Sequence, residues 1–191
     1  MSARSYRVNE IFCSLQGEGF WTGTPMVFVR LSGCNLRCPF CDTDHSAFRE
    51  MTADAIVAQV RACGGECRRI CLTGGEPALQ ADDALLSAFH SAGYSVHIET
   101  NGTRPLPEGI DWVTLSPKTG GPVILEKADE LKLVLAPGVE PSAWAGFPAT
   151  WHFLQPCDQG GRTNVAEVTA YIHAHPCWRL SLQTHKLLGI R

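Results

Sequence analysis

Residues 32–43 read Ser-Gly-Cys-Asn-Leu-Arg-Cys-Pro-Phe-Cys-Asp-Thr and place three cysteines, Cys34, Cys38 and Cys41, within eight positions. A structural zinc site needs four ligands and usually a second pair of closely spaced cysteines. The alternative of a zinc knuckle on these cysteines would require His45 as the fourth ligand. An iron–sulfur cluster normally takes four cysteines, so a cluster held by three leaves one iron open to a substrate or a cofactor. The spacing favours a 4Fe–4S cluster with one open iron.

The same spacing resembles the signature of the radical S-adenosylmethionine (SAM) superfamily. A second segment, Thr73-Gly74-Gly75-Glu76-Pro77, follows a predicted strand and resembles the glycine-rich motif of that superfamily. The resemblance implies that this motif binds the methionine amino group of SAM, which needs acceptors such as backbone carbonyls and a carboxylate. Paired glycines allow the backbone to approach a ligand, and Glu76 offers the carboxylate. SAM is therefore the second expected cofactor.

The composition is typical of a compact protein with one core. The 191 residues are 45% hydrophobic and 18% charged, which suffices for a single domain over residues 1–191. The net charge is −3 and no basic stripe runs along the chain, so no nucleic-acid partner is expected. No apolar run approaches the roughly 20 residues that cross a bilayer, so no membrane partner is expected. An odd total of nine cysteines, with no visible signal segment, argues against a disulfide framework and predicts a cytoplasmic location.

Apolar strands alternate with helical patterns along the chain. Strands are predicted at residues 26–31, 70–73, 94–99, 112–115, 131–135, 151–154 and 180–182, and helices at 52–63, 82–91 and 165–173. This alternation implies a parallel sheet with right-handed connections. A complete eight-stranded barrel takes about 250 residues, which is more than this chain offers. The expected fold is α/β, an incomplete, open parallel β/α barrel of the radical SAM type with about six strands.

Polar segments follow several of the predicted strands. They are Glu99-Thr100-Asn101-Gly102, Ser116-Pro117-Lys118 and Gln155-Pro156-Cys157-Asp158. Each segment alone is an ordinary turn. Because the carboxyl ends of parallel strands meet at one rim, the repeated placement predicts a shared site.

Four segments make the whole chain resemble the 7-carboxy-7-deazaguanine synthase family: residues 14–19, 30–43, 73–77 and 183–191. The resemblance implies a radical SAM lyase of queuosine and deazapurine biosynthesis. Such an enzyme cleaves SAM to a 5′-deoxyadenosyl radical and contracts the ring of 6-carboxy-5,6,7,8-tetrahydropterin, with loss of ammonia, to 7-carboxy-7-deazaguanine. It further implies a homodimer and an electron donor such as flavodoxin.

The resemblance also assigns site residues. The cluster would be held by Cys34, Cys38 and Cys41, and the pterin by Leu15, Gln16, Gly17, Arg30, Thr73 and Arg191. SAM would be bound by Gly75, Ser116, Pro117, Lys118, Gln155, Pro156, Cys157 and Asp158. These residue types suit the ligands, because a flat heterocycle with a carboxylate needs hydrogen-bonding partners such as Gln16 and a cation such as Arg30. For Arg191 we expect the main-chain carboxylate, not the side chain, to act.

Magnesium is the third expected cofactor. Mg²⁺ binds few protein ligands and keeps several other oxygens, so one hydroxyl beside the substrate carboxylate can suffice. The resemblance points to Thr43 as that ligand, with Asp42 as the alternative.

The other cysteines do not form a recognisable motif. Cys63, Cys67 and Cys71 are four residues apart, but they fall in a helix end, a loop and a strand, so we do not expect them to converge. Together with Cys13 and Cys177 they are interpreted as small buried hydrophobic residues.

Two rival functions stay open at this point. One is a glycyl-radical enzyme activase of the anaerobic ribonucleotide reductase type, which would share the cluster and SAM but act on a protein. The other is a non-enzymatic zinc or iron–sulfur module. Formation of a deazapurine from a pterin distinguishes the predicted synthase from both.

Overall fold

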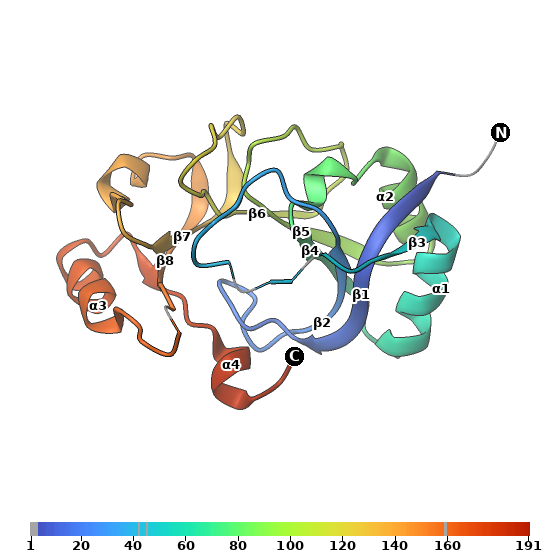
Figure 1. Ribbon diagram of the computed structural model, residues 1–191, viewed down its shortest axis with the longest axis horizontal. Helices are drawn as coiled ribbons and strands as arrows, with labels where there is room; N and C mark the ends of the chain where they lie inside the picture. Colours follow the sequence, from blue (N-terminus) through green and yellow to red (C-terminus); the bar gives the residue numbers. More distant parts are fainter. Residues whose placement is uncertain (1–3, 42, 45, 159) are drawn as a thin grey trace.

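The computed structural model describes residues 4–41, 43, 44, 46–158 and 160–191. In this part of the chain, nine strands form one curved sheet in the order β3-β1-β2-β4-β5-β6-β7-β8-β9 (Figure 1). The strands are β1 (Ser5–Leu15), β2 (Pro25–Leu31), β3 (Arg49–Thr52), β4 (Arg69–Gly74), β5 (Ser95–Thr100), β6 (Trp112–Leu115), β7 (Ala128–Leu135), β8 (Ala149–Pro156) and β9 (Arg179–Leu180). The helices are α1 (Ala53–Gly64), α2 (Asp83–Ser91), α3 (Val165–Ala174) and α4 (Thr184–Leu188), with 3₁₀ turns η1 (Pro77–Leu79) and η2 (Pro141–Trp144).

Most of the sheet is parallel. β2 pairs in parallel with β4, and the same orientation continues through β5, β6, β7, β8 and β9. β1 runs antiparallel to both β2 and β3. Within the described residues β3 and β9 end the sheet and do not pair with each other, so the sheet is not closed into a barrel. The prediction of an incomplete, open parallel β/α barrel is confirmed.

The sequence pattern misses β1 and two short elements, β3 and α4, and it misplaces β9. β3 has four residues, three of them exposed, and α4 has five, so neither shows a hydrophobic period. β3 forms because it pairs with β1 from Ser5 to Val8, a long-range contact that local sequence does not reveal. The last strand is Arg179–Leu180, where the pattern predicts 180–182.

The three longer helices cover the outer face of the sheet. α1 begins where the Thr52 hydroxyl accepts a hydrogen bond from the Ala55 amide at 3.3 Å, and it buries Ile56 and Val60 completely. α1 packs on β1 and β2, α2 on β5, and α3 on β8 and β9 (Figure 1). The core therefore lies between the sheet and these helices, and the inner face of the sheet is left for the site. No helix among the described residues is long and apolar enough to span a membrane.

An aromatic cluster closes the amino end of the barrel interior. Phe20, from the connection between β1 and β2, stacks on Trp112 at 5.0 Å and on Trp151 at 5.1 Å between ring centroids. The neighbouring Trp21 meets the edge of His97 at 5.0 Å, and burial lowers the pKa of His97 to about 4. These partners lie near the starts of β5, β6 and β8, so the carboxyl ends of the strands form the open side.

The cysteines outside the 32–43 stretch correct one expectation. Only Cys71, 1% exposed, is the small buried residue that was predicted, whereas Cys13, Cys63 and Cys177 are exposed and Cys67 is half-buried. Cys63 and Cys67 lie near each other because the turn after α1 folds back, with the Cys67 amide donating to the Gly64 carbonyl at 2.9 Å, but Cys71 is buried elsewhere, so within the described residues the three do not converge, as predicted.

Candidate active site

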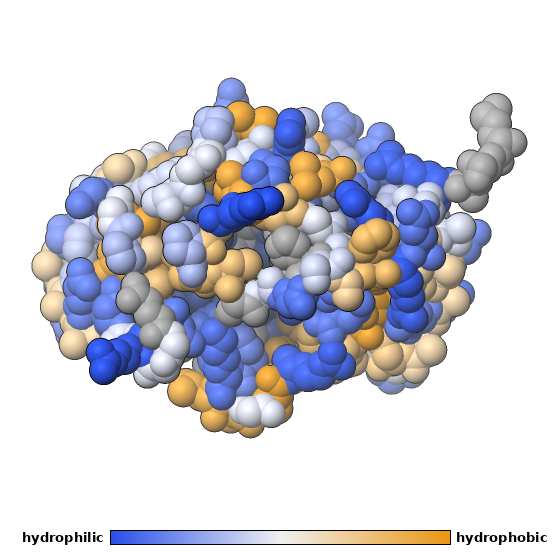
Figure 2. Space-filling model, in the orientation of Figure 1, coloured by the Kyte–Doolittle hydropathy of each residue, from blue (hydrophilic) through white to orange (hydrophobic). Residues whose placement is uncertain are grey.

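A cavity of about 450 Å³ opens at the carboxyl ends of the parallel strands. It is lined from the ends of β2, β4, β5, β7 and β8, by the loop after β2 and by the segment after β9. Figure 2 shows this hollow near the centre of one face, with hydrophilic side chains around it. The polar segments that follow successive strands thus share one site.

Cys34, Cys38 and Cys41 all line this cavity. The loop that carries them is held against the glycine-rich turn after β4. The Gly75 amide donates to the Leu31 carbonyl at 3.0 Å, and a Cβ on Gly75 would lie 2.1 Å from the Gly33 carbonyl oxygen. Gly75 is therefore needed for backbone packing beneath the first cysteine.

The cysteine loop lies beside a half-buried cation, Lys118. Burial raises the pKa of the Cys38 thiol, Lys118 opposes this, and the Cys41 and Cys34 thiols add to it. Lys118 donates to the Ser116 hydroxyl at 2.5 Å, and burial lowers the pKa of Lys118. The positive charge of Lys118 favours thiolates over thiols, and thiolates are the ligands that iron binds.

The three cysteines fit a 4Fe–4S cluster. All three are free thiols that line the cavity, and Cys41 and Cys34 are close enough to Cys38 to raise the pKa of its thiol. Among the described residues, no three His, Cys, Asp or Glu side chains converge on a point that could hold a single metal ion. A cubane does not require such convergence, because each thiolate binds a different iron. His45, the fourth ligand of the zinc alternative, lies outside the described residues.

Glu76 is placed differently from the expectation. Its side chain is 1% exposed and does not line the cavity. One carboxylate oxygen accepts from the Thr100 hydroxyl at 2.7 Å and the Ala78 amide at 3.0 Å, and the other accepts from the Asn101 amide at 2.7 Å. Glu76 therefore ties the glycine-rich turn to the end of β5 and is not directed at a ligand.

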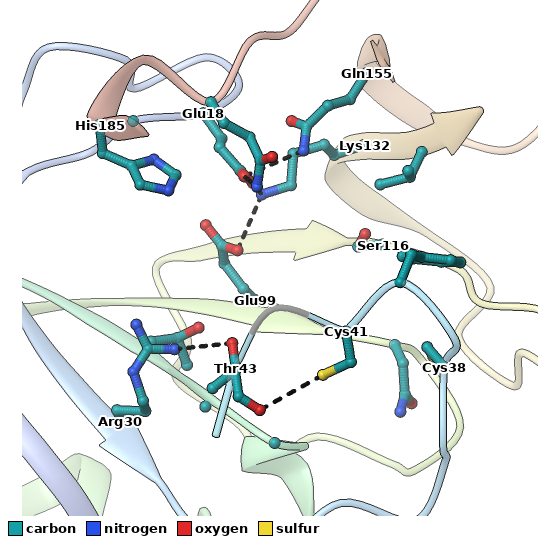
Figure 3. Close-up of a pocket in the computed structure, with 18 of the residues that line it drawn as sticks. Glu18, Arg30, Cys38, Cys41, Thr43, Glu99, Ser116, Lys132, Gln155 and His185 are labelled. Atoms are coloured by element: carbon teal, nitrogen blue, oxygen red, sulfur yellow. Dashed lines mark hydrogen bonds and ion pairs between the residues drawn. The ribbon is translucent and has the colours of Figure 1, made fainter. Parts of the chain in front are cut away.

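The residues expected to bind the pterin lie together. All six of them, Leu15, Gln16, Gly17, Arg30, Thr73 and Arg191, line the cavity. Arg30 pairs through Nε with Glu10 at 2.9 Å, and its Nη1 donates to the Thr43 hydroxyl at 3.4 Å (Figure 3). The Arg191 side chain also pairs with Glu10 and lies over the Phe12 ring, 4.8 Å from its centroid, while the Ser14 hydroxyl donates to the Arg191 main-chain oxygen.

The residues expected to bind SAM also line the cavity, with two exceptions. Gly75, Ser116, Lys118, Gln155, Pro156 and Asp158 line the cavity. Pro117 and Cys157 do not; both are buried between lining neighbours. The Cys157 amide donates to Asn164 Oδ1 at 2.8 Å, which fixes the backbone of that segment. Thr43 lines the cavity, whereas Asp42 lies outside the described residues.

A buried charged group was missed by the sequence reasoning. Lys132 Nζ lies 2.6 Å from Glu18 Oε2 and 2.9 Å from Glu99 Oε2, and its side chain is 3% exposed (Figure 3). Gln155 and Gln183 donate to the second oxygen of Glu18 at 3.1 and 2.9 Å. Lys132 lies inside a strand that the sequence predicts to be apolar. Because a lysine is buried in such a strand only when it is paired with an acidic side chain, its position could have indicated the group.

The group is held in its charged form by mutual pairing. Burial disfavours the ammonium of Lys132, but Glu18 and Glu99 outweigh it and keep the Lys132 pKa well above its ordinary value. Burial likewise opposes ionisation of Glu18, and Lys132 outweighs it, so the Glu18 pKa is lowered. Two carboxylates and one ammonium leave acceptor capacity facing the cavity.

The C-terminal segment completes this wall. The Thr184 amide and hydroxyl both donate to the Gly17 carbonyl at 2.9 Å. A Cβ on Gly17 would lie 2.1 Å from His185 Nδ1, so α4 sits directly against the residues that precede Glu18. His185 points toward Glu18 and Lys132 in Figure 3.

The chain is similar to known proteins along most of its length. A family model described as the radical SAM superfamily matches residues 28–133. The chain is 54% identical to the 7-carboxy-7-deazaguanine synthase of Bacteroides thetaiotaomicron over 97% of this chain and 98% of that protein. It is 43% identical to the synthase of Bordetella pertussis, over 97% and 99%. The crystal structure of QueE from Escherichia coli matches with a TM-score of 0.77 and 27% identity, over 93% of each chain. The chain therefore belongs to the 7-carboxy-7-deazaguanine synthase family of the radical SAM superfamily.

Proposed function

We propose that this chain is a radical SAM lyase that converts 6-carboxy-5,6,7,8-tetrahydropterin to 7-carboxy-7-deazaguanine with loss of ammonia. The observation that carries the proposal is one cavity that joins a three-cysteine loop to a buried Lys132–Glu18–Glu99 group. Concave sites with few, fixed polar groups suit small heterocycles. An activase of glycyl-radical enzymes would instead have to admit a polypeptide segment of a partner protein.

The cofactors follow from the family and the donor set. A 4Fe–4S cluster would be held by Cys34, Cys38 and Cys41. Of the eight residues assigned to SAM, the six that line the cavity would bind it, and Pro117 and Cys157 would hold the backbone of these neighbours in place. When bound, these cofactors supply the hydrogen-abstracting radical chemistry, and the protein supplies orientation and shielding. We assign the whole chain, residues 1–191, to one radical SAM core domain.

Arg30 is proposed to bind the substrate carboxylate. Its Nε is anchored by Glu10 at 2.9 Å, so the guanidinium is held in one orientation toward the cavity. A fixed guanidinium can form paired hydrogen bonds with a carboxylate. The neighbouring wall at Leu15, Gln16 and Gly17, with Thr73 and the main-chain end of Arg191, would border the same ligand.

The Lys132–Glu18–Glu99 group is proposed to receive the other end of the pterin. The aminopyrimidinone ring presents N–H donors, and carboxylate oxygens are acceptors. Gln16 Nε2 donates to Glu99 Oε1 at 2.8 Å, which fixes that carboxylate. With the carboxylate of the substrate at Arg30 and the N–H edge at Glu18 and Glu99, the ring would be oriented before hydrogen is removed.

Mg²⁺ is proposed to bind at Thr43 beside the substrate carboxylate. The Thr43 hydroxyl lies 3.4 Å from Arg30 Nη1, so both groups face the same part of the cavity. A hard cation with oxygen ligands would fix the carboxylate from a second direction. Asp42 is the alternative ligand.

Family membership also motivates proposals about partners. We propose a homodimer in the cytoplasm that accepts electrons from a donor such as flavodoxin. Analytical ultracentrifugation of the purified protein and electron transfer from reduced flavodoxin to the cluster test these two points separately.

Anaerobic reconstitution tests the function. The loaded protein is incubated with SAM, a reductant and the carboxy-tetrahydropterin, and the products are separated. We expect 7-carboxy-7-deazaguanine and ammonia to form together, and Cys38→Ala to abolish both along with the cluster absorbance. SAM cleavage without deazapurine, accompanied by a glycyl radical on a partner enzyme, would support the activase instead.

A further inference from the structure

Three cysteines gather outside the active site, beside the end of α1. Cys13 lies near the end of β1, Cys63 in the last turn of α1, and Cys67 in the turn between α1 and β4. All three are free thiols; Cys13 and Cys63 are exposed and Cys67 is half-buried. None of them lines the active-site cavity.

The register of β1 and β2 explains why these thiols meet. Cys13 lies opposite Val27, and residues directly opposite in an antiparallel pair project from the same face. A Cβ on Gly64 would lie 2.7 Å from a methyl group of Val27, so this face is the one against the end of α1. Cys13 therefore faces the turn that carries Cys67.

Cys13 and Cys67 lie close together on this face. Burial raises the pKa of the Cys13 thiol, and the neighbouring Cys67 and Cys63 thiols raise it further. Cys67 is also held by the Pro25 carbonyl at 3.3 Å and the Arg69 carbonyl at 3.5 Å. These two carbonyls, at the first residues of β2 and β4, fix Cys67 beside the strand pair that carries Cys13.

We propose that Cys13 and Cys67 form a reversible disulfide, a redox modification site separate from the radical SAM site. Each thiol loses its hydrogen and a sulfur–sulfur bond forms. The two hydrogens pass to a two-electron oxidant, such as an azodicarboxamide, whose nitrogen–nitrogen double bond is reduced to a hydrazine. A dithiol reductant reverses the reaction by exchange.

The proposal is tested on the cluster-loaded protein under anaerobic conditions. The protein is treated with diamide, its remaining thiols are alkylated, and peptides are identified by mass spectrometry without reduction. We expect one cross-linked pair of peptides that contain Cys13 and Cys67, lighter than the sum of the free peptides by two hydrogen atoms. Dithiothreitol should reverse it, and the visible absorbance of the cluster should persist throughout.

Single substitutions assign the bond. Trypsin leaves Cys63 and Cys67 on one peptide, residues 62–68, so Cys63→Ser is needed to show that the link uses Cys67. The cross-link should survive in Cys63→Ser and in the matched control Cys177→Ser, and it should be absent in Cys13→Ser and Cys67→Ser. Oxidation of the exposed Cys177 would show that diamide has reacted with the protein. If Cys13 and Cys67 are nevertheless both recovered as alkylated thiols, or if the cross-link persists in Cys67→Ser, the proposal is wrong.

Discussion

At the scale of single residues, Arg30 is the most informative side chain of the site. Glu10 anchors its Nε, and Nη1 reaches Thr43, so it forms part of a fixed wall and is not a mobile surface cation. Arg30→Ala should weaken pterin binding by about 2–5 kcal/mol and SAM binding far less, because a guanidinium–carboxylate pair in a dry site is hard to replace. Anaerobic calorimetry with each ligand measures this, with the exposed Arg104→Ala as control. Equal losses for both ligands would indicate a structural role for Arg30.

Thr43 is the residue on which the magnesium proposal depends. Removing Mg²⁺ should slow turnover markedly, since a small misplacement of the substrate can cost around 100-fold in rate. Thr43→Ala should blunt the response to Mg²⁺, and Thr43→Ser, which keeps the hydroxyl, should retain more of it. Product formation is measured across a magnesium titration for all three proteins. An unchanged titration in Thr43→Ala would move the ligand to Asp42.

Lys132 is the residue that holds the buried charges in balance. Lys132→Met leaves Glu18 and Glu99 facing each other in a buried site without their cation. We expect a loss of about 3–5 kcal/mol in the free energy of unfolding, as for other broken buried pairs, together with loss of activity. Urea unfolding measures it, with the exposed Lys127→Met as control. Adding Glu18→Gln to Lys132→Met should recover part of the loss; no recovery would contradict the pairing.

At the scale of elements, the glycine-rich turn after β4 supports the cysteine loop. Gly75→Ala would place a methyl group 2.1 Å from the Gly33 carbonyl, and backbone cannot move aside as a flexible side chain can. We expect iron content and SAM cleavage to fall strongly while the secondary structure persists. Gly146→Ala is the matched control, because no atom lies within 4 Å of its Cβ position. Wild-type iron content in Gly75→Ala would show that the loop does not rely on this contact.

Elements with a clear hydrophobic period could be predicted from the sequence. An element that forms only by pairing with a distant strand could not. α1 and α2 start at Thr52 and Asp82, whose side chains cap them, so local chemistry marks their beginnings. β3 forms by pairing with β1, which lies more than 40 residues earlier in the sequence, and its own four residues show no strand pattern. Glu76 shows the same limit within the site: its motif predicts a ligand, but Thr100 at the end of β5 and Asn101 just after it engage both of its oxygens.

At the scale of the whole molecule, the site is assembled from both ends of the chain. The Gly17 carbonyl accepts from Thr184, and Glu18 accepts from Gln155 and Gln183. The cysteine motif could be recognised because its chemistry is local. The Lys132–Glu18–Glu99 group could not, because its members come from β7, the connection between β1 and β2, and β5, which only the folded sheet brings together.

Glu130 connects the closed end of the barrel to overall stability. It is 2% exposed, one of its oxygens has no hydrogen-bond partner within the described part of the chain, and the other accepts from the Phe20 amide at 3.1 Å. Burial raises its pKa from 4.5 to about 7. Between these values the unfolded chain has released this proton and the folded chain retains it, so the free energy of unfolding falls as the pH rises toward 7.

Glu130→Gln removes this titration, and its effect should therefore depend on pH. The stability of the variant relative to wild type should rise from pH 5 to pH 8, by at most about 3 kcal/mol, because a shift of one pKa unit corresponds to about 1.4 kcal/mol. Anaerobic urea unfolding of both proteins at each pH measures the difference. The exposed Glu126→Gln should show a constant difference over the same range. A constant difference for Glu130→Gln as well would mean that Glu130 ionises as readily in the folded protein as in the unfolded chain, and that the contact between Phe20 and β7 does not depend on a protonated carboxyl group.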